Sequence, residues 1–385
     1  MIKIAMVAGE ASSDQLAAHL IGALKRHRPQ ARFYGIGGPK MQREGFDVLW
    51  PSEKLSVRGY AEVLSHYREI TGIRRRLLAQ LLRDKPDIFI GVDGSDFNLW
   101  LEKRLKRAGI PTIQFVSPSI WAWRRKRISK IVAAVNHVLA LYPFEPKLYE
   151  GTPVKCSYVG HPLADVIPLE IDQHAVREKL NLVHDRPVVA LLPGSRQSEL
   201  QYMAETFIEA GKLLLQRYPK VLFLVPLVSR ETRHQFEVAL WKLKAEELPF
   251  KLMFGHAAEA VAASDAVLVA SGTATLETAL VGRPMVIAYK MSPWSWRLMR
   301  GMRYLPWVGL PNILAERYVV PEFLQDDATP ENLAQAVGNL LSDPIVCAGI
   351  KRVFDGVHRL LRQDTAQKAA DALLPYLSDS GPRVA

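Results

Sequence analysis

Short apolar runs alternate along the chain with longer stretches in which apolar residues recur at helical spacing. Such runs are typical of parallel strands buried on both faces, and the periodic stretches are typical of helices packed on the sheet. In the first half, strands are predicted at 2–8, 33–36, 88–92, 112–116, 138–141 and 158–159. The pattern therefore predicts an α/β domain with a parallel sheet.

One helical stretch in this half, over 55–83, is unusually long and basic. Its apolar side runs from Tyr60 to Leu78, and arginines such as Arg75 and Arg76 are interspersed. This composition suits an anionic bilayer surface, and it suits equally a buried amphipathic helix with one solvated face.

The alternation restarts at Val188, after a polar stretch over 160–185 that is predicted to be a linker. Strands are predicted at 188–192, 221–225, 252–254, 266–270 and 285–289. The final helical stretch, 345–374, has no strand after it, so it can cross back to the first domain. We expect domains at 1–165 and 166–344, whose sheets face a cleft at the carboxyl ends of their strands, and a C-terminal helical segment at 345–385.

The strand 188–192 runs directly into the turn Pro193-Gly194-Ser195-Arg196. A helix is predicted to begin at once, with Ser198 and Gln201 as a capping box. Backbone N–H groups at a helix start carry partial positive charge, and the guanidinium of Arg196 adds a fork-shaped charge that suits a diphosphate. Taken alone, the turn is explained equally well by a strand-to-helix connection with a solvated arginine.

A second turn of this kind, Ser271-Gly272-Thr273, follows the strand 266–270. Gly272 lets a nucleotide approach the backbone, and the carboxylate of Glu277 can accept both hydroxyls of a ribose. Two such turns in one domain favour a nucleotide site over a glutamate stabilised by the helix dipole. Neither G-x-x-x-x-G-K-[ST] nor G-x-G-x-x-G occurs, so a kinase or dehydrogenase has little support. Asn312 and Gln325 follow the last predicted strand, and turn chemistry explains Asn312 equally well.

Asp93 ends the strand 88–92, where α/β folds place reactive groups, and is a candidate general base; the alternative is a turn-forming aspartate. Asp96 is expected to cap the next helix. Trp121 and Trp123 can line a pocket for a sugar or an acyl chain, although interface packing explains them as well. Arg124 opens a basic run that is most often just a solvated face, although a phosphorylated substrate would use it.

Charge and composition restrict the classes of ligand and partner that the chain is expected to bind. Lys and Arg number 50 against 39 Asp and Glu, a net charge of +11, which favours phosphate-rich ligands or an anionic membrane surface. The two cysteines, Cys156 and Cys347, have no metal-type spacing and fit a reducing cytosol. No D-x-D occurs, so we expect no metal and no cofactor. No apolar run is long enough to span a membrane, and no nucleic-acid-binding motif is present.

Seven motifs together closely resemble the lipid-A-disaccharide synthase family, in the same order and over nearly the whole chain. They are GEASSD at 9–14, GVDGSDFN at 91–98, SPSIWAWRRKR at 117–127, GHPLAD at 160–165, LLPGSR at 191–196, SGTATLE at 271–277 and LPNILA at 310–315. The resemblance implies a GT-B glycosyltransferase of Gram-negative bacteria, with an acceptor-binding and a UDP-sugar donor-binding Rossmann-like domain. That family moves 2,3-diacylglucosamine from UDP onto the 6-hydroxyl of 2,3-diacylglucosamine 1-phosphate and inverts the anomeric centre.

The resemblance also assigns roles to residues. Asp93 matches the essential aspartate of the family. The donor site is expected to comprise Arg196, Ser271, Gly272, Thr273, Glu277, Asn312 and Gln325, and the acceptor site Glu10, Trp121, Trp123 and Arg124. Ser13 departs from the glycine that the family usually shows, which leaves the shape of the Glu10 loop open.

The expected location is the cytoplasm, in peripheral association with the anionic inner membrane, and a homodimer is also considered. The alternative enzyme is another GT-B protein that uses UDP-N-acetylglucosamine, an epimerase or a muramyl-type transferase.

Overall fold

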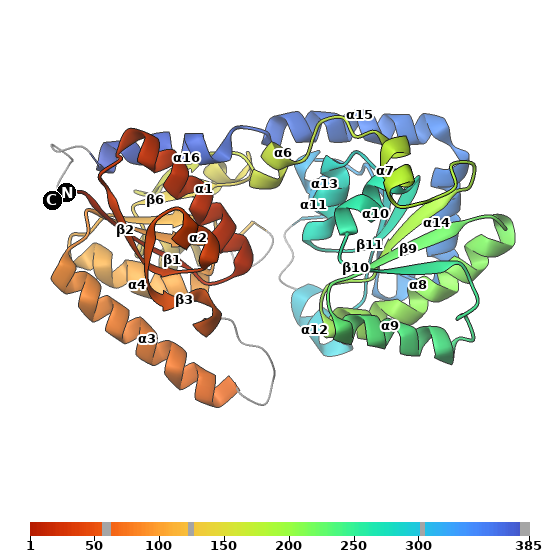
Figure 1. The fold of residues 1–385 in the computed structure, drawn as a ribbon, viewed down its shortest axis with the longest axis horizontal. Coiled ribbons are helices and arrows are strands. Elements are labelled where there is room, and N and C mark those ends of the chain that lie inside the picture. The colour runs from red at the N-terminus through yellow and green to blue at the C-terminus, as the bar shows by residue number, and fades with distance from the viewer. Residues whose placement is uncertain (56–62, 122–126, 301–304, 378–385) are drawn as a thin grey trace. The chain divides into compact units, whose positions relative to one another are not determined.

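The computed structural model describes residues 1–55, 63–121, 127–300 and 305–377. The chain divides into two compact units: Met1–Asp165 with Leu361–Ala385, and Val166–Leu360. Within the described residues, each unit is built on one parallel sheet covered by helices (Figure 1). The predicted α/β class with two parallel-sheet domains is confirmed.

The first unit contains the strands β1 (Lys3–Ala8), β2 (Arg32–Gly37), β3 (Phe46–Pro51), β4 (Ile88–Val92), β5 (Thr112–Phe115), β6 (His137–Ala140) and β7 (Lys155–Tyr158). They pair in the order β3-β2-β1-β4-β5-β6-β7. In β1, Ile4 and Met6 pack into one hydrophobic cluster, and Ala5 and Val7 pack into the cluster on the opposite face. Because both faces are covered, the strand is a continuous apolar run.

The helices of this unit are α1 (Ala11–His27), α2 (Pro39–Arg43), α3 (Val63–Asp84), α4 (Ser95–Arg107), α5 (Ile128–Val132), α6 (Pro162–Val166) and α16 (Thr365–Leu373). Short 3-10 turns lie at Ser52–Lys54, Glu145–Tyr149 and Leu374–Tyr376. Leucines of α1 and alanines of α16 share one core cluster, and leucines of α3 and α4 share the cluster on the other face of the sheet (Figure 1).

The long basic helix predicted over 55–83 is described as α3 from Val63 to Asp84, and Tyr60 lies outside the described residues. The buried positions of its apolar side are Ile73, Leu77 and Leu81, and the exposed arginines are Arg68, Arg75, Arg76 and Arg83. The described part of the apolar side is therefore used in the core, as the buried-helix interpretation required.

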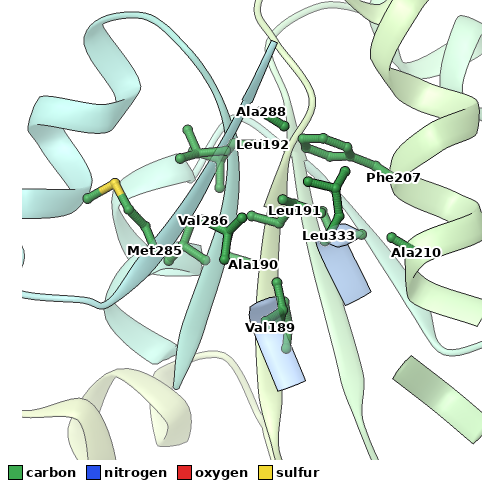
Figure 2. Packing of buried hydrophobic residues seen from close by; sticks show 14 of the residues in the cluster. Val189, Ala190, Leu191, Leu192, Phe207, Ala210, Met285, Val286, Ala288 and Leu333 are labelled. Atoms are coloured by element: carbon green, nitrogen blue, oxygen red, sulfur yellow. The ribbon is translucent and has the colours of Figure 1, made fainter. Parts of the chain in front are cut away.

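The second unit contains β8 (Val188–Leu192), β9 (Leu222–Leu227), β10 (Phe250–Phe254), β11 (Ala266–Ala270), β12 (Met285–Tyr289) and β13 (Glu322–Leu324), in the order β10-β9-β8-β11-β12-β13. Its helices are α7 (Gln173–Lys179), α8 (Gln197–Arg217), α9 (Arg230–Lys242), α10 (Ala257–Ala263), α11 (Thr273–Leu280), α12 (Pro293–Arg300), α13 (Leu310–Leu314), α14 (Pro330–Ser342) and α15 (Pro344–Leu361), with a 3-10 turn at Gln325–Asp327. Figure 2 shows Val189 and Leu191 of β8 among core side chains that include Phe207 of α8 and Leu333 of α14.

Two strands were not predicted. β3 pairs only with β2 among the described strands, and its apolar run is broken by the exposed Asp47. β13 has three residues, all half-buried, which is too short for a periodic pattern. Both lie at the edge of a sheet, where one-sided burial weakens the apolar signal.

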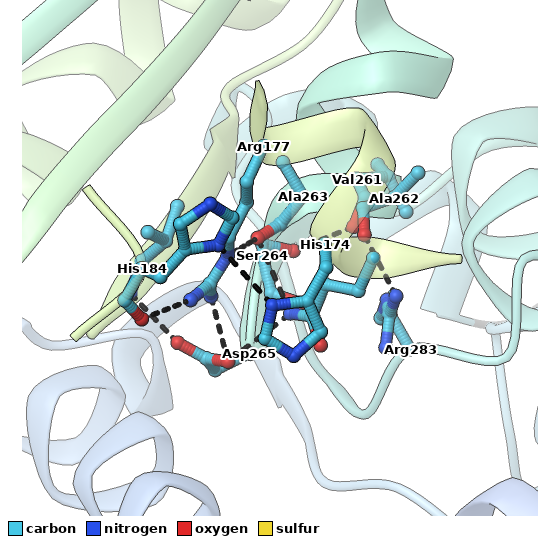
Figure 3. A network of polar contacts seen from close by, with 11 residues as sticks. His174, Arg177, His184, Val261, Ala262, Ala263, Ser264, Asp265 and Arg283 are labelled. Atoms are coloured by element: carbon cyan, nitrogen blue, oxygen red, sulfur yellow. Dashed lines mark hydrogen bonds and ion pairs between the residues drawn. The ribbon is translucent and has the colours of Figure 1, made fainter. Parts of the chain in front are cut away.

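The stretch 160–185, predicted to be a linker, contains the helices α6 and α7. Arg177 of α7 is buried; it donates to Asp265 at 2.8 Å and to the carbonyl oxygens of Ala263 and His184 at 2.9 and 3.0 Å (Figure 3). Asp265 also accepts the N–H of Val188 at 2.8 Å. The sequence pattern missed α7 because its buried residue, Arg177, is polar and Val176 is the helix residue that packs against the hydrophobic clusters.

The final helical stretch is broken into two helices. α15 belongs to the second unit up to Leu360, and α16 belongs to the first. The second unit therefore extends beyond the predicted boundary at 344, and only the part of the segment 345–385 that begins at Leu361 joins the first unit. The carboxylate of Asp165 accepts the N–H groups of Gln363, Asp364 and Thr365 at 3.0, 3.0 and 2.8 Å, which caps α16.

Among the described residues, no single helix is long and apolar enough to cross a membrane. One bent pair of helices, Pro330–Ser342 with Pro344–Tyr376, has the length and composition of a span, by these two properties only.

Candidate functional site

The predicted site residues of the first unit follow β1, β4 and β5, which are neighbours in the sheet. Glu10 follows β1 and Asp93 follows β4, and the order of the strands reverses between these two. Ligands of open α/β sheets bind outside the carboxyl ends of the strands at such a reversal. The fold thus brings Glu10 and Asp93 to the edge where a ligand is expected.

Asp93 is held through its backbone, and its side chain is exposed. Its N–H donates to the carbonyl of Phe115 at 2.8 Å. Its own carbonyl accepts the side-chain amides of Asn98 and Gln114, both at 2.9 Å. The residue has φ +53°, a left-handed conformation that is uncommon for a residue other than glycine. The contacts fix the backbone and leave the carboxylate facing solvent.

Asp96 does not cap the helix that follows. Gly94 is the N-cap of α4, so Asp96 lies inside the first turn, where it pairs with Arg127.

Glu10 is the N-cap of α1, which begins at Ala11. The N–H of Glu10 donates to Ser13 Oγ at 2.9 Å, and that hydroxyl donates to the carbonyl oxygen of Glu10 at 2.9 Å. Ser13 therefore adds two hydrogen bonds that a glycine could not make. Its neighbour Asp14 is buried and accepts three backbone N–H groups, those of Gly38, Lys40 and Met41, at 2.9–3.1 Å.

Trp121 is half-buried and packs edge-on against Tyr142 and Phe144, with ring centroids 6.1 and 5.5 Å away. Glu145 lies buried in this cluster. Burial raises its pKa to about 8, although the backbone N–H of Tyr142, which donates to Glu145 Oε2 at 3.0 Å, opposes the rise. Trp121 is thus packed in an aromatic cluster around a buried acid. Trp123 and Arg124 lie outside the described residues.

His161 is buried and stacks on Tyr142 at 5.6 Å. Burial lowers its pKa to about 4, so the ring is neutral at neutral pH. A buried, neutral imidazole stacked on an aromatic ring fits a structural role.

The donor-type motifs of the second unit also follow neighbouring strands. Arg196 follows β8 and Ser271 follows β11, and the strand order of this sheet reverses between β8 and β11. Asn312 and Gln325 flank β13, next to β12. The second sheet therefore also collects its predicted site residues at one reversal point and the strands beside it.

Arg196 is the N-cap of α8 and its side chain is exposed. The prediction that Ser198 and Gln201 form a capping box is wrong. Glu199 takes this role: its Oε2 accepts the N–H groups of Ser195 and Arg196 at 2.9 and 3.2 Å. Because Glu199 uses these N–H groups, an anion here depends more on the guanidinium of Arg196 than on the helix terminus.

The same contact explains Gly194. It has φ +126°, and a Cβ at this position would lie 2.6 Å from the Cβ of Glu199.

The Ser271-Gly272-Thr273 turn is open on its outer side. Gly272 is the N-cap of α11 and exposed, and a Cβ there would meet no described atom within 4 Å. Thr273 is also exposed. Glu277 is the fifth residue of α11, beyond the first turn, where the dipole has little effect. It is half-buried, and burial together with the charge of Glu259 raises its pKa.

Asn312 is fully buried, and its amide is occupied on both sides. Its Nδ2 donates to Val320 O at 2.9 Å and to Glu322 Oε1 at 2.8 Å, and its Oδ1 accepts the N–H groups of Val319 and Val320 at 2.7 and 3.0 Å. This geometry argues against direct side-chain contact with a donor. Gln325 resembles it, because its amide bonds both backbone groups of Met291, at 2.7 and 3.1 Å.

Four polar residues at these edges were missed from the sequence: Asn98, Glu102, Gln114 and Glu199. Asn98 and Glu102 are one helical turn apart on the buried side of α4, a polar pair where apolar residues were expected. Glu199 is the third residue of its helix, a position typical of capping glutamates. Among the described residues, no group of three or more His, Cys, Asp or Glu is arranged to hold a metal ion.

Solved structures with a similar fold cover almost the whole chain. The UDP-GlcNAc 2-epimerase from Neisseria meningitidis bound to UDP-GlcNAc superposes with a TM-score of 0.63 at 13% identity, over 98% of this chain and 99% of that one. A glycosyltransferase from Rickettsia africae ESF-5 superposes with a TM-score of 0.62 at 12% identity, over 98% and 99%. Together with the two sheets and their site edges, these matches define the fold as GT-B.

The sequence relatives are more specific. Residues 4–372 match the family described as lipid-A-disaccharide synthetase. The chain is 60% identical over 378 residues to the lipid-A-disaccharide synthase of Azoarcus sp. (strain BH72), covering 98% of this chain and 97% of that protein. It is also 60% identical to that of Dechloromonas aromatica (strain RCB), covering 98% and 99%. The chain belongs to the lipid-A-disaccharide synthase family.

Proposed function

We propose that this chain transfers 2,3-diacylglucosamine from UDP-2,3-diacylglucosamine to the 6-hydroxyl of 2,3-diacylglucosamine 1-phosphate, with inversion of the anomeric centre. The products are UDP and lipid A disaccharide 1-phosphate. The observation that carries the proposal is the family match over residues 4–372. An epimerase or muramyl-type transferase is not favoured, because the epimerase shares only the fold at 13% identity whereas the synthases share 60%.

The donor is proposed to bind the second domain, 166–344, through Arg196, Ser271, Gly272, Thr273 and Glu277. The exposed guanidinium of Arg196 suits the diphosphate, and the open surface at Gly272 leaves room for a ligand near the backbone. Glu277 is proposed to accept the ribose hydroxyls. We propose that Asn312 and Gln325 act indirectly, by fixing the loops around β13, since their amides bond the protein itself.

The acceptor is proposed to bind the first domain, 1–165, with Asp93 as the general base. A base must receive the proton of the 6-hydroxyl as that oxygen attacks the sugar carbon, and the exposed carboxylate of Asp93 meets that need. Glu10, at the same strand reversal, and Trp121 are the proposed acceptor contacts beside it. Trp123 remains a proposed contact for the sugar or an acyl chain of the acceptor, and Arg124 a proposed contact for its phosphate.

We also propose a cytoplasmic protein in peripheral contact with the anionic inner membrane. The exposed arginines of α3 support this, whereas the buried part of its apolar side does not. A homodimer is proposed as the assembly, to be tested by its mass in analytical ultracentrifugation.

The proposed reaction is tested by mass spectrometry of the products formed from the two purified substrates. A β-1,6 disaccharide 1-phosphate in equal amount to UDP is expected. Release of UDP without a disaccharide, or conversion of UDP-N-acetylglucosamine to its 2-epimer, would contradict the proposal.

A further inference from the structure

A cluster of buried polar side chains lies directly under Asp93. Asn98 and Glu102 of α4 and Gln114 of β5 have at most 1% of their surface exposed. Both carboxyl oxygens of Glu102, together with Asn98 Oδ1 and Gln114 Oε1, lack a hydrogen-bond partner among the described residues. Buried polar atoms without a hydrogen-bond partner are rare in folded proteins, and four of them in one cluster indicate a specific role for these side chains.

The nitrogen atoms of the two amides both hold the backbone of Asp93. Asn98 Nδ2 and Gln114 Nε2 both donate to the backbone carbonyl of Asp93, at 2.9 Å each. Gln114 Nε2 also lies 3.2 Å from the carbonyl of Val116, which has φ +78°. Asp93 and Val116, at the ends of β4 and β5, thus both adopt left-handed backbone conformations, which persist only when surrounding contacts impose them.

Glu102 is placed to act on Asn98. The two are four residues apart on α4, so they share one face of the helix. Both side chains pack closely against Gly91 of β4. A Cβ atom at this position would lie 2.4 Å from Glu102 Oε1 and 2.9 Å from Asn98 Cγ. The absence of a side chain at Gly91 creates the space that the two groups share.

The chemistry of the two groups is complementary. Burial raises the pKa of Glu102 well above its usual value, because a low-dielectric interior disfavours the charged carboxylate and favours the neutral carboxyl group. A neutral carboxyl group has one O–H to donate, and Asn98 Oδ1 is a buried acceptor that lacks a donor.

We infer that Glu102, Asn98 and Gln114 are positioning residues for Asp93. The Glu102 O–H donates to Asn98 Oδ1 and orients the amide, whose Nδ2 then holds the Asp93 carbonyl from one side while Gln114 holds it from the other. The inference rests on the proposed role of Asp93 as the base. Beyond the exposed carboxylate of Asp93, the inference assigns a role to the buried groups that fix the direction of this carboxylate.

The test compares two replacements of Glu102. Glu102→Gln keeps an N–H donor toward Asn98, whereas Glu102→Met keeps the volume and removes the donor. We expect Glu102→Gln to retain kcat within about threefold and Glu102→Met to lower it about 10- to 100-fold, the cost of a small misplacement of a catalytic group. KM for the UDP-sugar and UDP affinity should stay unchanged in both, because the donor motifs lie in the other unit.

Asn98→Ala is the second variant, should Glu102→Met fail to fold, and the same loss of kcat is expected. Each variant is also measured in an Asp93→Asn background, where the loss should disappear because no base is left to position. Equal kcat for Glu102→Gln and Glu102→Met overturns the inference, as does an undiminished loss in the Asp93→Asn background. If Asp93→Asn alone keeps normal turnover, Asp93 is not the base, and the positioning role inferred for Glu102, Asn98 and Gln114 is refuted with it.

Discussion

Replacing Arg196 by alanine is the most direct test of the donor site. The side chain is exposed at the N-cap of α8, so its truncation leaves no buried polar group without a partner. The whole effect should therefore appear in ligand binding. A hydrogen bond to a charged group contributes about 1.5–3 kcal/mol, which predicts UDP binding that is about 12- to 160-fold weaker.

The assay is isothermal titration calorimetry of UDP against the wild type and the variant, at fixed salt because the interaction is electrostatic. Arg230→Ala is the matched control, since Arg230 is an exposed arginine at the first position of α9, after β9 of the same sheet. It removes the same charge away from the reversal between β8 and β11 and should leave affinity within about twofold, as an exposed residue without ligand contact.

Thermal unfolding of both variants should match the wild type. Unchanged UDP affinity in Arg196→Ala would refute the donor site as we describe it. An equal loss in Arg230→Ala would show that net charge, and not the guanidinium at the turn, attracts the nucleotide.

Four further predictions concern catalysis, metal, pH and the membrane. Asp93→Asn should lower turnover at least about tenfold with UDP affinity intact, and more than a tenth of normal turnover would make Asp93 structural. Turnover should survive EDTA, because the chain has no D-x-D; a loss that Mg²⁺ or Mn²⁺ restores would contradict this. Burial raises the pKa of Glu145 to about 8, so above about pH 4.5 the unfolded chain binds fewer protons than the folded one, and stability should fall as pH rises toward 8. Urea titrations of Glu145→Gln should show this slope reduced by up to about 1.4 kcal/mol per pH unit, and an unchanged slope would reject the assignment. Removing both Arg75 and Arg76 should lower partitioning onto anionic vesicles about 30-fold, at about 1 kcal/mol per arginine; equal partitioning of the wild type onto neutral and anionic vesicles would exclude the electrostatic contact.

The strands that position the site could be predicted because they are buried on both faces. β8 and β11 are fully apolar runs, so their ends, and with them Arg196 and Ser271, were located from the sequence. α7 was missed because Arg177 is held by carbonyl oxygens and Asp265, which lies 88 residues further on. A polar helix of this kind has no local apolar signal.

The environment of the site residues was harder to predict than their positions. Asn312 stands in a turn-like motif, but its amide bonds Val320 and Glu322, which lie eight and ten residues further along the chain. The support of Asp93 likewise needs Gln114 from the next strand and a glycine at position 91. Such contacts join segments by tertiary structure, so spacing along the chain does not reveal them.

The cap that Asp165 provides for α16 has a consequence for biosynthesis. The two partners are separated by 200 residues, and between them the chain makes the second unit. At about 5–20 residues per second, the ribosome needs roughly 10–40 s to make this interval. During that time the first unit lacks Ala369, Ala370 and Leu373, and the cluster they share with α1 stays open. The unit whose synthesis begins first is therefore completed last. Its apolar surface stays exposed on the nascent chain, and this surface is where a chaperone would be needed.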